Sequence, residues 1–399
     1  MPHDSTLPIR RSVRLRHAHR RLVLALLVIT SSAAAQSGDG AIAEAALLRP
    51  ERTYVGRDQA IMVRLQPPAE AQNPELVLLD AAGDPVSGPI SIRPGRYDIA
   101  SLLPGLTSLR EVGYLQMLDL GDPIGSPLVI QPLLSRIIPV TEQFTDDRGR
   151  ARTRIVGWRP YFAEDASAES VTIDAAEPEA LATLREQCIL SGFRLYLDVD
   201  VLLQTSQGDI RVALRPDAAP NTVWNFLQLC RHGFYRDLPF HRIVPADRAG
   251  NPFIVQVGDP SGTGRGGPGY WLALEPSPLP HDFGVLSMAR ADAPDSGGGQ
   301  FFICLSRDGT RDLDGQYCTF GYAVSGAENI MRLADVQLRD VERGEAVDPP
   351  RLLHTLLLPA PPRTPGFGRL DRPVYEDPPP AFDPLAPEAE AEADADALP

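Results

Sequence analysis

The chain has 399 residues and a formal net charge of −14. Its length is sufficient for two domains, and its acidic surplus argues against binding nucleic acid through phosphate contacts. Only four cysteines are present, and none has the C-x-x-C spacing of a zinc site, so we expect no metal site.

The first 35 residues have the pattern of a secretory signal peptide. Six arginines precede the apolar run LVLALLVI at 22–29, and the small-residue run TSSAAAQ follows at 30–36. The apolar run is far shorter than the roughly 20 residues that span a bilayer. We therefore expect cleavage after Ala35 and export to the periplasm, the cell envelope or the exterior, with no stable membrane insertion afterwards. The alternative is a retained short anchor.

Residues 46–134 predict an immunoglobulin-like β-sandwich domain. Short apolar runs alternate with polar residues, as in QAIMVRLQ at 59–66, and turn residues separate the runs. Short, closely spaced strands with such turns are typical of antiparallel sandwiches. We interpret residues 135–195 as a connector, in which 177–189 has helical composition. The partner of the N-terminal domain is unknown.

Residues 196–358 predict a second domain, because the pattern of strands and helices becomes sharper there. Two strand-like runs meet at the turn Ser206-Gln207-Gly208, and the segment 219–235 has a helix-start signal at Pro220 and Asn221. Four apolar residues recur at helical spacing and therefore form one face of that helix: Val223, Phe226, Leu227 and Cys230.

The segment FHRIVPADRAGNPFIVQVGD at 240–259 predicts a hairpin with two unexpected polar side chains. By the two-residue period of a strand, Arg242 lies on the same face of the first strand as its apolar neighbours, and Gln256 lies on the same face of the second strand as Ile254. If the two strands pair, the arginine and the glutamine share one face of the hairpin. A buried strand would normally carry aliphatic residues at these positions, so the pattern indicates a functional face.

The end of the chain and the cysteines allow more than one interpretation. Residues 359–399 are rich in proline, alanine and acidic residues, which predicts a disordered tail, with an acidic interaction tail as the alternative. In an oxidising compartment Cys304 and Cys318 could form a disulfide, but two buried free thiols fit the sequence at least as well.

Several blocks between Asp198 and Leu358 resemble the cyclophilin-type peptidyl-prolyl cis-trans isomerases. In the family's order, the chain contains FHRI, FIVQVGD, LSMA, GQFFI, and LDG followed by FG. The resemblance implies a closed antiparallel barrel of eight strands capped by two helices. It also implies isomerisation of X–Pro bonds in proline-containing polypeptides, without a cofactor.

The resemblance further implies the residues of a site. Arg242 would be the catalytic arginine, and Gln256 and Gln300 would act with it. The substrate-binding groove and proline pocket would be formed by Phe253, Ile254, Ala289, Arg290 through its backbone, Phe302, Leu313 and Tyr317.

Simpler interpretations exist for the same residues. Arg242 could be structural and pair with Asp259 or Asp292, and one of the two phenylalanines at 301–302 should be plain core by strand parity. No Ser/His/Asp pattern or carboxylate pair suggests hydrolysis. For the whole protein, the alternatives to an isomerase are a catalytically weak module that binds proline-containing peptides and a structural scaffold of the cell envelope.

Three features depart from the family's pattern. The turn before Phe253 is longer by about six residues, at 246–251, which lengthens the hairpin tip and need not shift its register. Asp312 stands where many members carry an aromatic side chain, which puts tight cyclosporin binding in doubt. One extra residue lies within 291–300.

Overall fold

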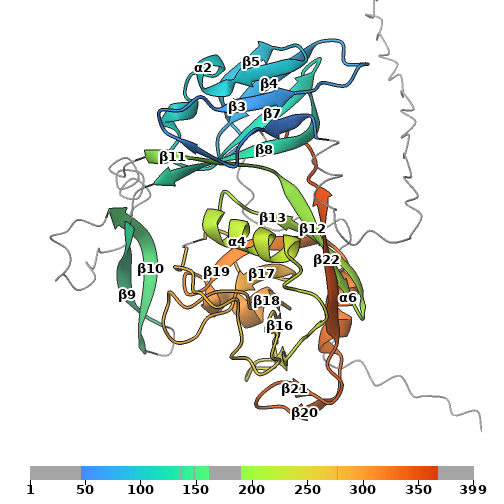
Figure 1. Cartoon of the computed structure of the whole chain (residues 1–399). Coiled ribbons are helices and arrows are strands. Elements are labelled where there is room, and N and C mark those ends of the chain that lie inside the picture. The colour runs from blue at the N-terminus through green and yellow to red at the C-terminus, as the bar shows by residue number, and fades with distance from the viewer. Residues whose placement is uncertain (1–45, 135–136, 147–148, 161–189, 276, 367–399) are drawn as a thin grey trace, which may run out of the picture. The chain divides into compact units, whose positions relative to one another are not determined.

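The computed structural model describes residues 46–134, 137–146, 149–160, 190–275 and 277–366, and most of its regular structure is strand (Figure 1). The expected signal peptide, the expected helix at 177–189 and residues 367–399 of the expected tail lie outside the described residues. No helix in the described ranges is both long enough and apolar enough to cross a membrane.

A three-stranded antiparallel sheet lies nearest the start of the described chain. It has the order β1 (Leu48–Pro50), β3 (Met62–Leu65), β6 (Gly95–Asp98). In β3, Val63 and Leu65 are buried and Arg64 between them is exposed, as expected for a sheet with one solvated face. Asp98 caps the short helix α2 (Ile99–Leu102) by accepting a hydrogen bond from the N–H of Ala100, and the 3-10 turn η1 (Leu106–Ser108) follows.

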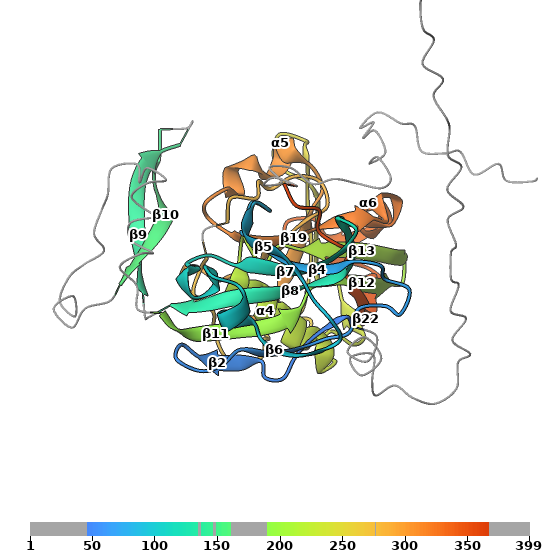
Figure 2. The same ribbon diagram turned by 90° about the horizontal axis from the view of Figure 1, so that it is seen from above.

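A six-stranded antiparallel sheet contributes to the same core. Figure 2 shows its order, which is β2 (Tyr54–Gly56), β11 (Leu190–Leu197), β8 (Asp122–Leu134), β7 (Gly113–Asp119), β4 (Pro74–Leu79) and β5 (Pro85–Ser91). Buried side chains from both sheets form one apolar cluster that includes Leu48, Val63, Leu76, Leu115 and Phe193. The two sheets therefore share a core, and the immunoglobulin-like topology stays a prediction.

Part of the segment interpreted as a connector belongs to this sheet. Strand β11 pairs with β8 on one side and with β2 on the other, and its Phe193 and Leu195 are buried. The local pattern could not reveal this, because both partner strands are distant in sequence. The same segment also contains β9 (Ile137–Thr145) and β10 (Ala151–Pro160), which pair with each other as a separate hairpin.

A nine-stranded antiparallel sheet forms the C-terminal region. Its order is β14 (Leu238–Pro239), β22 (Arg351–Pro359), β12 (Val199–Thr205), β13 (Gly208–Leu214), β19 (Cys318–Ser325), β17 (Val285–Met288), β18 (Phe301–Cys304), β16 (Pro252–Val257) and β15 (Arg242–Ala246). The two end strands, β14 and β15, are separated in the chain only by Phe240 and His241. Within the described residues they are not paired with each other, so closure into a barrel stays a prediction.

Short elements lie beside this sheet. The N–H of Ile243 on the end strand β15 donates to the carbonyl of Gly344, which lies in the turn between β20 (Leu338–Asp340) and β21 (Glu345–Ala346). Between β18 and β19 lie α5 (Arg307–Thr310) and η3 (Arg311–Leu313), and α6 (Ala327–Ala334) follows β19. The turn of β20 and β21 therefore satisfies one backbone donor of the sheet's end strand.

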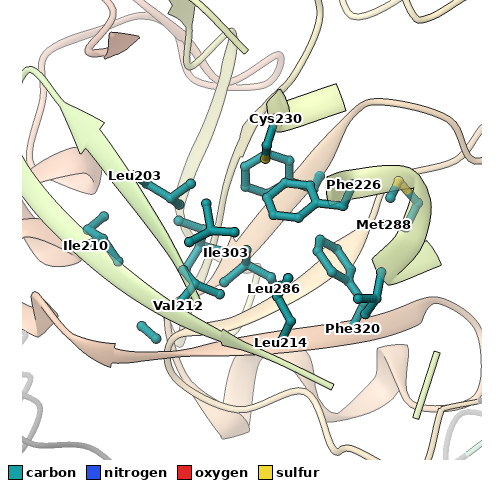
Figure 3. Packing of buried hydrophobic residues seen from close by; sticks show 14 of the residues in the cluster. Leu203, Ile210, Val212, Leu214, Phe226, Cys230, Leu286, Met288, Ile303 and Phe320 are labelled. Carbon is teal, nitrogen blue, oxygen red and sulfur yellow. The ribbon is translucent and has the colours of Figure 1, made fainter. Parts of the chain in front are cut away.

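The helix α4 (Pro220–Arg231) packs its apolar face into the core of the nine-stranded sheet (Figure 3). This confirms the predicted face, since Val223, Phe226, Leu227 and Cys230 are all buried. The ring of Phe226 meets those of Phe301 and Phe320, at centroid distances of 5.4 and 5.1 Å. Burying a side chain of this size contributes about 1.5–3 kcal/mol, so α4 is held mainly by packing.

The three described cysteines, Cys230, Cys304 and Cys318, are buried free thiols. The possible bridge between Cys304 and Cys318 is therefore not formed, and the alternative of buried thiols holds. Burial raises the pKa of all three thiols, which keeps them protonated and unreactive near neutral pH.

A cluster of buried charges, here called the junction cluster, links the six-stranded sheet to the nine-stranded one. It consists of Tyr114, Asp198, Arg215, Asp217 and Arg363. Arg363 pairs with Asp198 at 2.9 Å, and its guanidinium lies 3.7 Å from the centroid of the Tyr114 ring. Arg215 pairs with Asp217 at 2.7 Å, and the hydroxyl of Tyr114 donates to the same carboxylate. Arg363 belongs to the segment assigned to the tail, so residues just after β22 take part in the packing.

Candidate active site

Three neighbouring strands place the predicted polar and aromatic residues side by side. Arg242 on β15 is directly opposite Gln256 on β16, and Gln256 is directly opposite Phe302 on β18. Residues opposite each other in adjacent strands project from the same face of a sheet. The predicted hairpin is therefore confirmed, and its polar face continues onto a third strand.

A chain of side-chain amides holds the arginine. Arg242 donates from Nη1 to Oε1 of Gln256 at 3.3 Å, and Gln256 donates from Nε2 to Oε1 of Gln300 at 2.9 Å. Gln300 in turn donates to the carbonyls of Gly264 and Gly266, at 3.1 and 2.7 Å. The structure thus brings Arg242, Gln256 and Gln300 together, and the loop that carries Gly264 and Gly266 anchors the far end of the chain of amides.

The guanidinium of Arg242 has no carboxylate partner among the described residues, and Gln256 is its recorded hydrogen-bond partner. The alternative that Arg242 pairs with Asp259 or Asp292 is not supported. Asp259 instead accepts hydrogen bonds from the backbone N–H and the hydroxyl of Ser261. Burial lowers the pKa of Arg242, but an arginine remains charged at physiological pH.

An apolar cluster lies beside this polar row. Ile254, Phe302 and Cys304 are buried in one cluster, against which other predicted pocket residues pack while keeping part of their surface exposed: Phe253, Ala289, Leu313 and Tyr317. The rings of Phe302 and Tyr317 meet edge to face, at a centroid distance of 5.6 Å and an interplanar angle of 82°. The structure thus gathers these predicted pocket residues in one apolar cluster.

The two phenylalanines at 301–302 divide as strand parity requires. Phe301 has no exposed surface and packs in the main core with Phe226, whereas Phe302 belongs to the pocket cluster. This confirms the expectation that one of the pair is plain core.

A Ser287–His281–Asp314 row packs against Phe302, with Ser287 and His281 buried and Asp314 partly exposed, and no sequence pattern marked it. His281 Nδ1 lies 2.9 Å from Asp314 Oδ1, His281 Nε2 lies 2.9 Å from Ser287 Oγ, and the His281 ring stacks on Phe302 at 6.0 Å. The three residues follow the order of a hydrolase triad, but Ser287 has no exposed surface and cannot reach a substrate. We interpret the row as a structural support, in which His281 packs against Phe302.

Asp314 carries the charge of this row. Burial alone would raise its pKa, but hydrogen bonds from His281 and Arg307 outweigh burial and lower the pKa to about 2. The Arg307 ion pair has a distance of 2.6 Å. Asp314 is therefore ionised at neutral pH and fixes the turn that carries Leu313.

Comparison with known proteins identifies a matching family for the C-terminal region. Residues 200–354 match the family model described as cyclophilin type peptidyl-prolyl cis-trans isomerase/CLD. A peptidyl-prolyl cis-trans isomerase of Synechococcus elongatus is 46% identical over 120 residues, which cover 30% of this chain and 77% of that protein. The chain belongs to this family. Isomerase B of Bacillus subtilis is 45% identical, over 30% of this chain and 78% of its own length. An Arabidopsis thaliana peptidyl-prolyl isomerase is 40% identical, over 36% and 85%.

Two of the departures from the cyclophilin pattern can be located in the structure. At the long hairpin tip the carboxylate of Asp247 accepts hydrogen bonds from the N–H groups of Ala249 and Asn251, at 2.8 and 2.9 Å. Arg242 stays opposite Gln256, so the longer tip does not shift the register, as expected. Asp312 is exposed on the loop before Leu313.

The described residues contain no group of three or more His, Cys, Asp or Glu side chains arranged to hold a metal ion. The site offers instead one charged donor, two amide side chains and an apolar cluster. Such a set can bind a proline ring and stabilise a polar backbone, and it contains no exposed nucleophile.

Proposed function

We propose that this cyclophilin-type isomerase performs its reaction in the groove formed by Arg242, Gln256, Gln300, Phe302 and Tyr317. The observation that carries the proposal is the guanidinium of Arg242, which has no carboxylate partner among the described residues and donates to the amide of Gln256 beside an apolar cluster. An arginine kept for structure would be expected to pair with a carboxylate, as Arg215 and Arg363 do.

The physical basis is the resonance of the imide bond. An X–Pro bond isomerises over a barrier of about 18–20 kcal/mol, which takes tens to hundreds of seconds without a catalyst. In the twisted transition state the nitrogen lone pair is localised, so a hydrogen-bond donor beside it stabilises that state more than either planar isomer. This is differential binding of the transition state, and it requires neither a nucleophile nor a metal.

Each side chain then has a distinct task. The apolar pocket around Phe302 holds the proline ring and excludes water from the imide. Arg242 donates to the imide nitrogen as the bond twists, and its rigid, permanently charged fork suits that task. Gln256 and Gln300 orient the fork, and Gln300 also fixes the neighbouring loop.

Exchange NMR on a proline-containing peptide tests the proposal. The wild-type protein should accelerate cis–trans exchange, and Arg242→Ala should lower the acceleration about 100- to 1000-fold, the usual cost of removing one transition-state donor. Arg248→Ala is the matched control, because Arg248 is an exposed arginine at the tip of the same hairpin. Peptide shift changes without faster exchange in the wild type would instead favour the alternative of a proline-peptide binding module.

We propose further that the chain is exported and assists the folding of exported proteins. The support is the signal-like sequence of residues 1–35. Expression in a bacterial host followed by fractionation and N-terminal mass analysis should find the mature chain beginning at Gln36, outside the cytoplasm. A cytoplasmic chain that retains Met1 would contradict the proposal.

A further inference from the structure

The side chain of Arg290 joins two loops that border the groove. From Nη1 it donates to the carbonyls of Ala291 and Asp292 on its own loop, at 2.9 and 3.1 Å. From Nε it donates to the carbonyl of Gln316 on the other loop, at 3.0 Å. Its guanidinium also lies over the ring of Tyr317, with the central carbon 4.6 Å from the ring centroid.

Tyr317 in turn contacts the apolar cluster beside Arg242. Its ring lies edge to face with that of Phe302, at a centroid distance of 5.6 Å. Tyr317 therefore lies between Arg290 and Phe302. One ring face is covered by Arg290, so the orientation of the ring depends on where the guanidinium is held.

We propose that Arg290 is a positioning residue, whose side chain fixes Tyr317 as a wall of the substrate groove. The inference rests on the proposed function of the groove and adds a role for this side chain, for which the resemblance implied only backbone contacts. Arginine is required because a planar fork can donate within its plane to both loops while its face covers the ring. A lysine has no flat face and cannot do both.

The contacts of Arg290 also separate positioning from general stability. The side chain of Arg290 donates hydrogen bonds to backbone carbonyls and contacts the ring of Tyr317. Among the described residues, no carboxylate forms an ion pair with it. Removing it therefore leaves no buried charge without a partner. The main consequence is a freer Tyr317 ring and a freer loop at 311–317, which weakens binding of the peptide before the bond twists.

Steady-state kinetics on a proline-containing peptide test this role. Arg290→Ala should raise KM about 10-fold with kcat changed less than 2-fold, and Arg290→Lys should resemble Arg290→Ala. Arg311→Ala is the matched control, because Arg311 is an exposed arginine on the loop that carries Tyr317, and its KM should stay at the wild-type value. A large loss of kcat in Arg290→Ala with KM unchanged would overturn the proposal, as would full activity in Arg290→Lys.

A double-mutant cycle shows whether Arg290 acts through Tyr317. Tyr317→Ala alone should raise KM, and adding Arg290→Ala to it should change KM less than 2-fold, because the ring to be positioned is gone. Fully additive effects would contradict the proposal. If the wild type lacked turnover, the peptide dissociation constant from NMR shifts would replace KM, so failure of the groove's proposed function stays distinguishable from failure of this inference.

Discussion

Arg242 in the groove and Arg363 in the junction cluster are both withdrawn from water, but their partners differ. Arg242 donates to the neutral amide of Gln256, and burial lowers its pKa. Burial also disfavours the charge of Arg363, yet Tyr114, Asp198 and Asp217 together raise its pKa above the ordinary value. The fold therefore compensates the charge of one arginine and leaves that of the other available.

This difference indicates how function and stability are divided in the chain. A guanidinium with a carboxylate partner has its donors occupied, so it contributes to holding elements together. A guanidinium held only by amides keeps part of its charge for a ligand, at some expense of stability. We therefore expect substitutions in the junction cluster to lower the free energy of unfolding, and substitutions in the groove to lower catalytic activity.

The largest effect on stability should come from Arg363→Ala. The change leaves the carboxylate of Asp198, only 6% exposed, without its ion-pair partner, so we expect a loss of about 3–5 kcal/mol in the free energy of unfolding. Urea denaturation measures it. Arg332→Ala is the control, because it breaks an exposed pair with Glu328 on α6 and should cost about 0.5 kcal/mol or less. Equal losses in the two variants would contradict the assignment.

Substitution of two glutamines should have smaller effects, one on catalytic activity and the other on stability. Gln256→Ala should lower kcat/KM about 10-fold while changing stability by less than about 1 kcal/mol, because Gln256 orients the fork of Arg242. Gln131 at the six-stranded sheet is bonded to Asn221 and Arg194, at 3.1 and 3.0 Å. Gln131→Ala should therefore cost about 1–3 kcal/mol of stability and leave kcat/KM of the folded protein unchanged. The opposite pattern in either variant would break the comparison.

The smallest effect should appear in the pH dependence of Asp314→Asn. Because the pKa of Asp314 is lowered from 3.8 to about 2, its ionised form stabilises the fold above pH 3.8, and that contribution disappears as the pH falls towards 2. The side chain is 36% exposed, so screening limits the contribution to about 1 kcal/mol. Urea midpoints between pH 2 and pH 7 should differ between wild type and variant at neutral pH and converge as the pH approaches 2. A difference that stays constant to pH 3 would show that Asp314 is not the titrating group.

The groove could be predicted from sequence because its residues lie in short blocks with fixed spacing. The two-residue period alone placed Arg242 and Gln256 on one face, and the resemblance supplied Gln300, Phe302 and Tyr317 from other blocks. The structure brings all of these together. Their roles in catalysis stay predictions.

The junction could not be predicted, because its contacts join residues far apart in the chain. Arg363 contacts Asp198 and Tyr114, which are more than one hundred and sixty residues away in the sequence, and no local pattern indicates such contacts. In the same way, the sequence of β11 could not be identified as part of the six-stranded sheet, because its partner strands are distant in the chain. The Arg290 side chain was also missed, since its interaction with Tyr317 depends on how two loops approach each other.

The most direct test of the account compares Arg242→Ala and Arg363→Ala in one exchange NMR experiment on a proline-containing peptide, at equal concentrations of folded protein. We predict that Arg242→Ala loses about 100-fold or more of the exchange rate and that Arg363→Ala retains the wild-type rate. Retention of the rate in Arg242→Ala would contradict the central claim that the guanidinium of Arg242 is the catalytic donor. Equal losses in both variants would show that the two arginines do not differ in function.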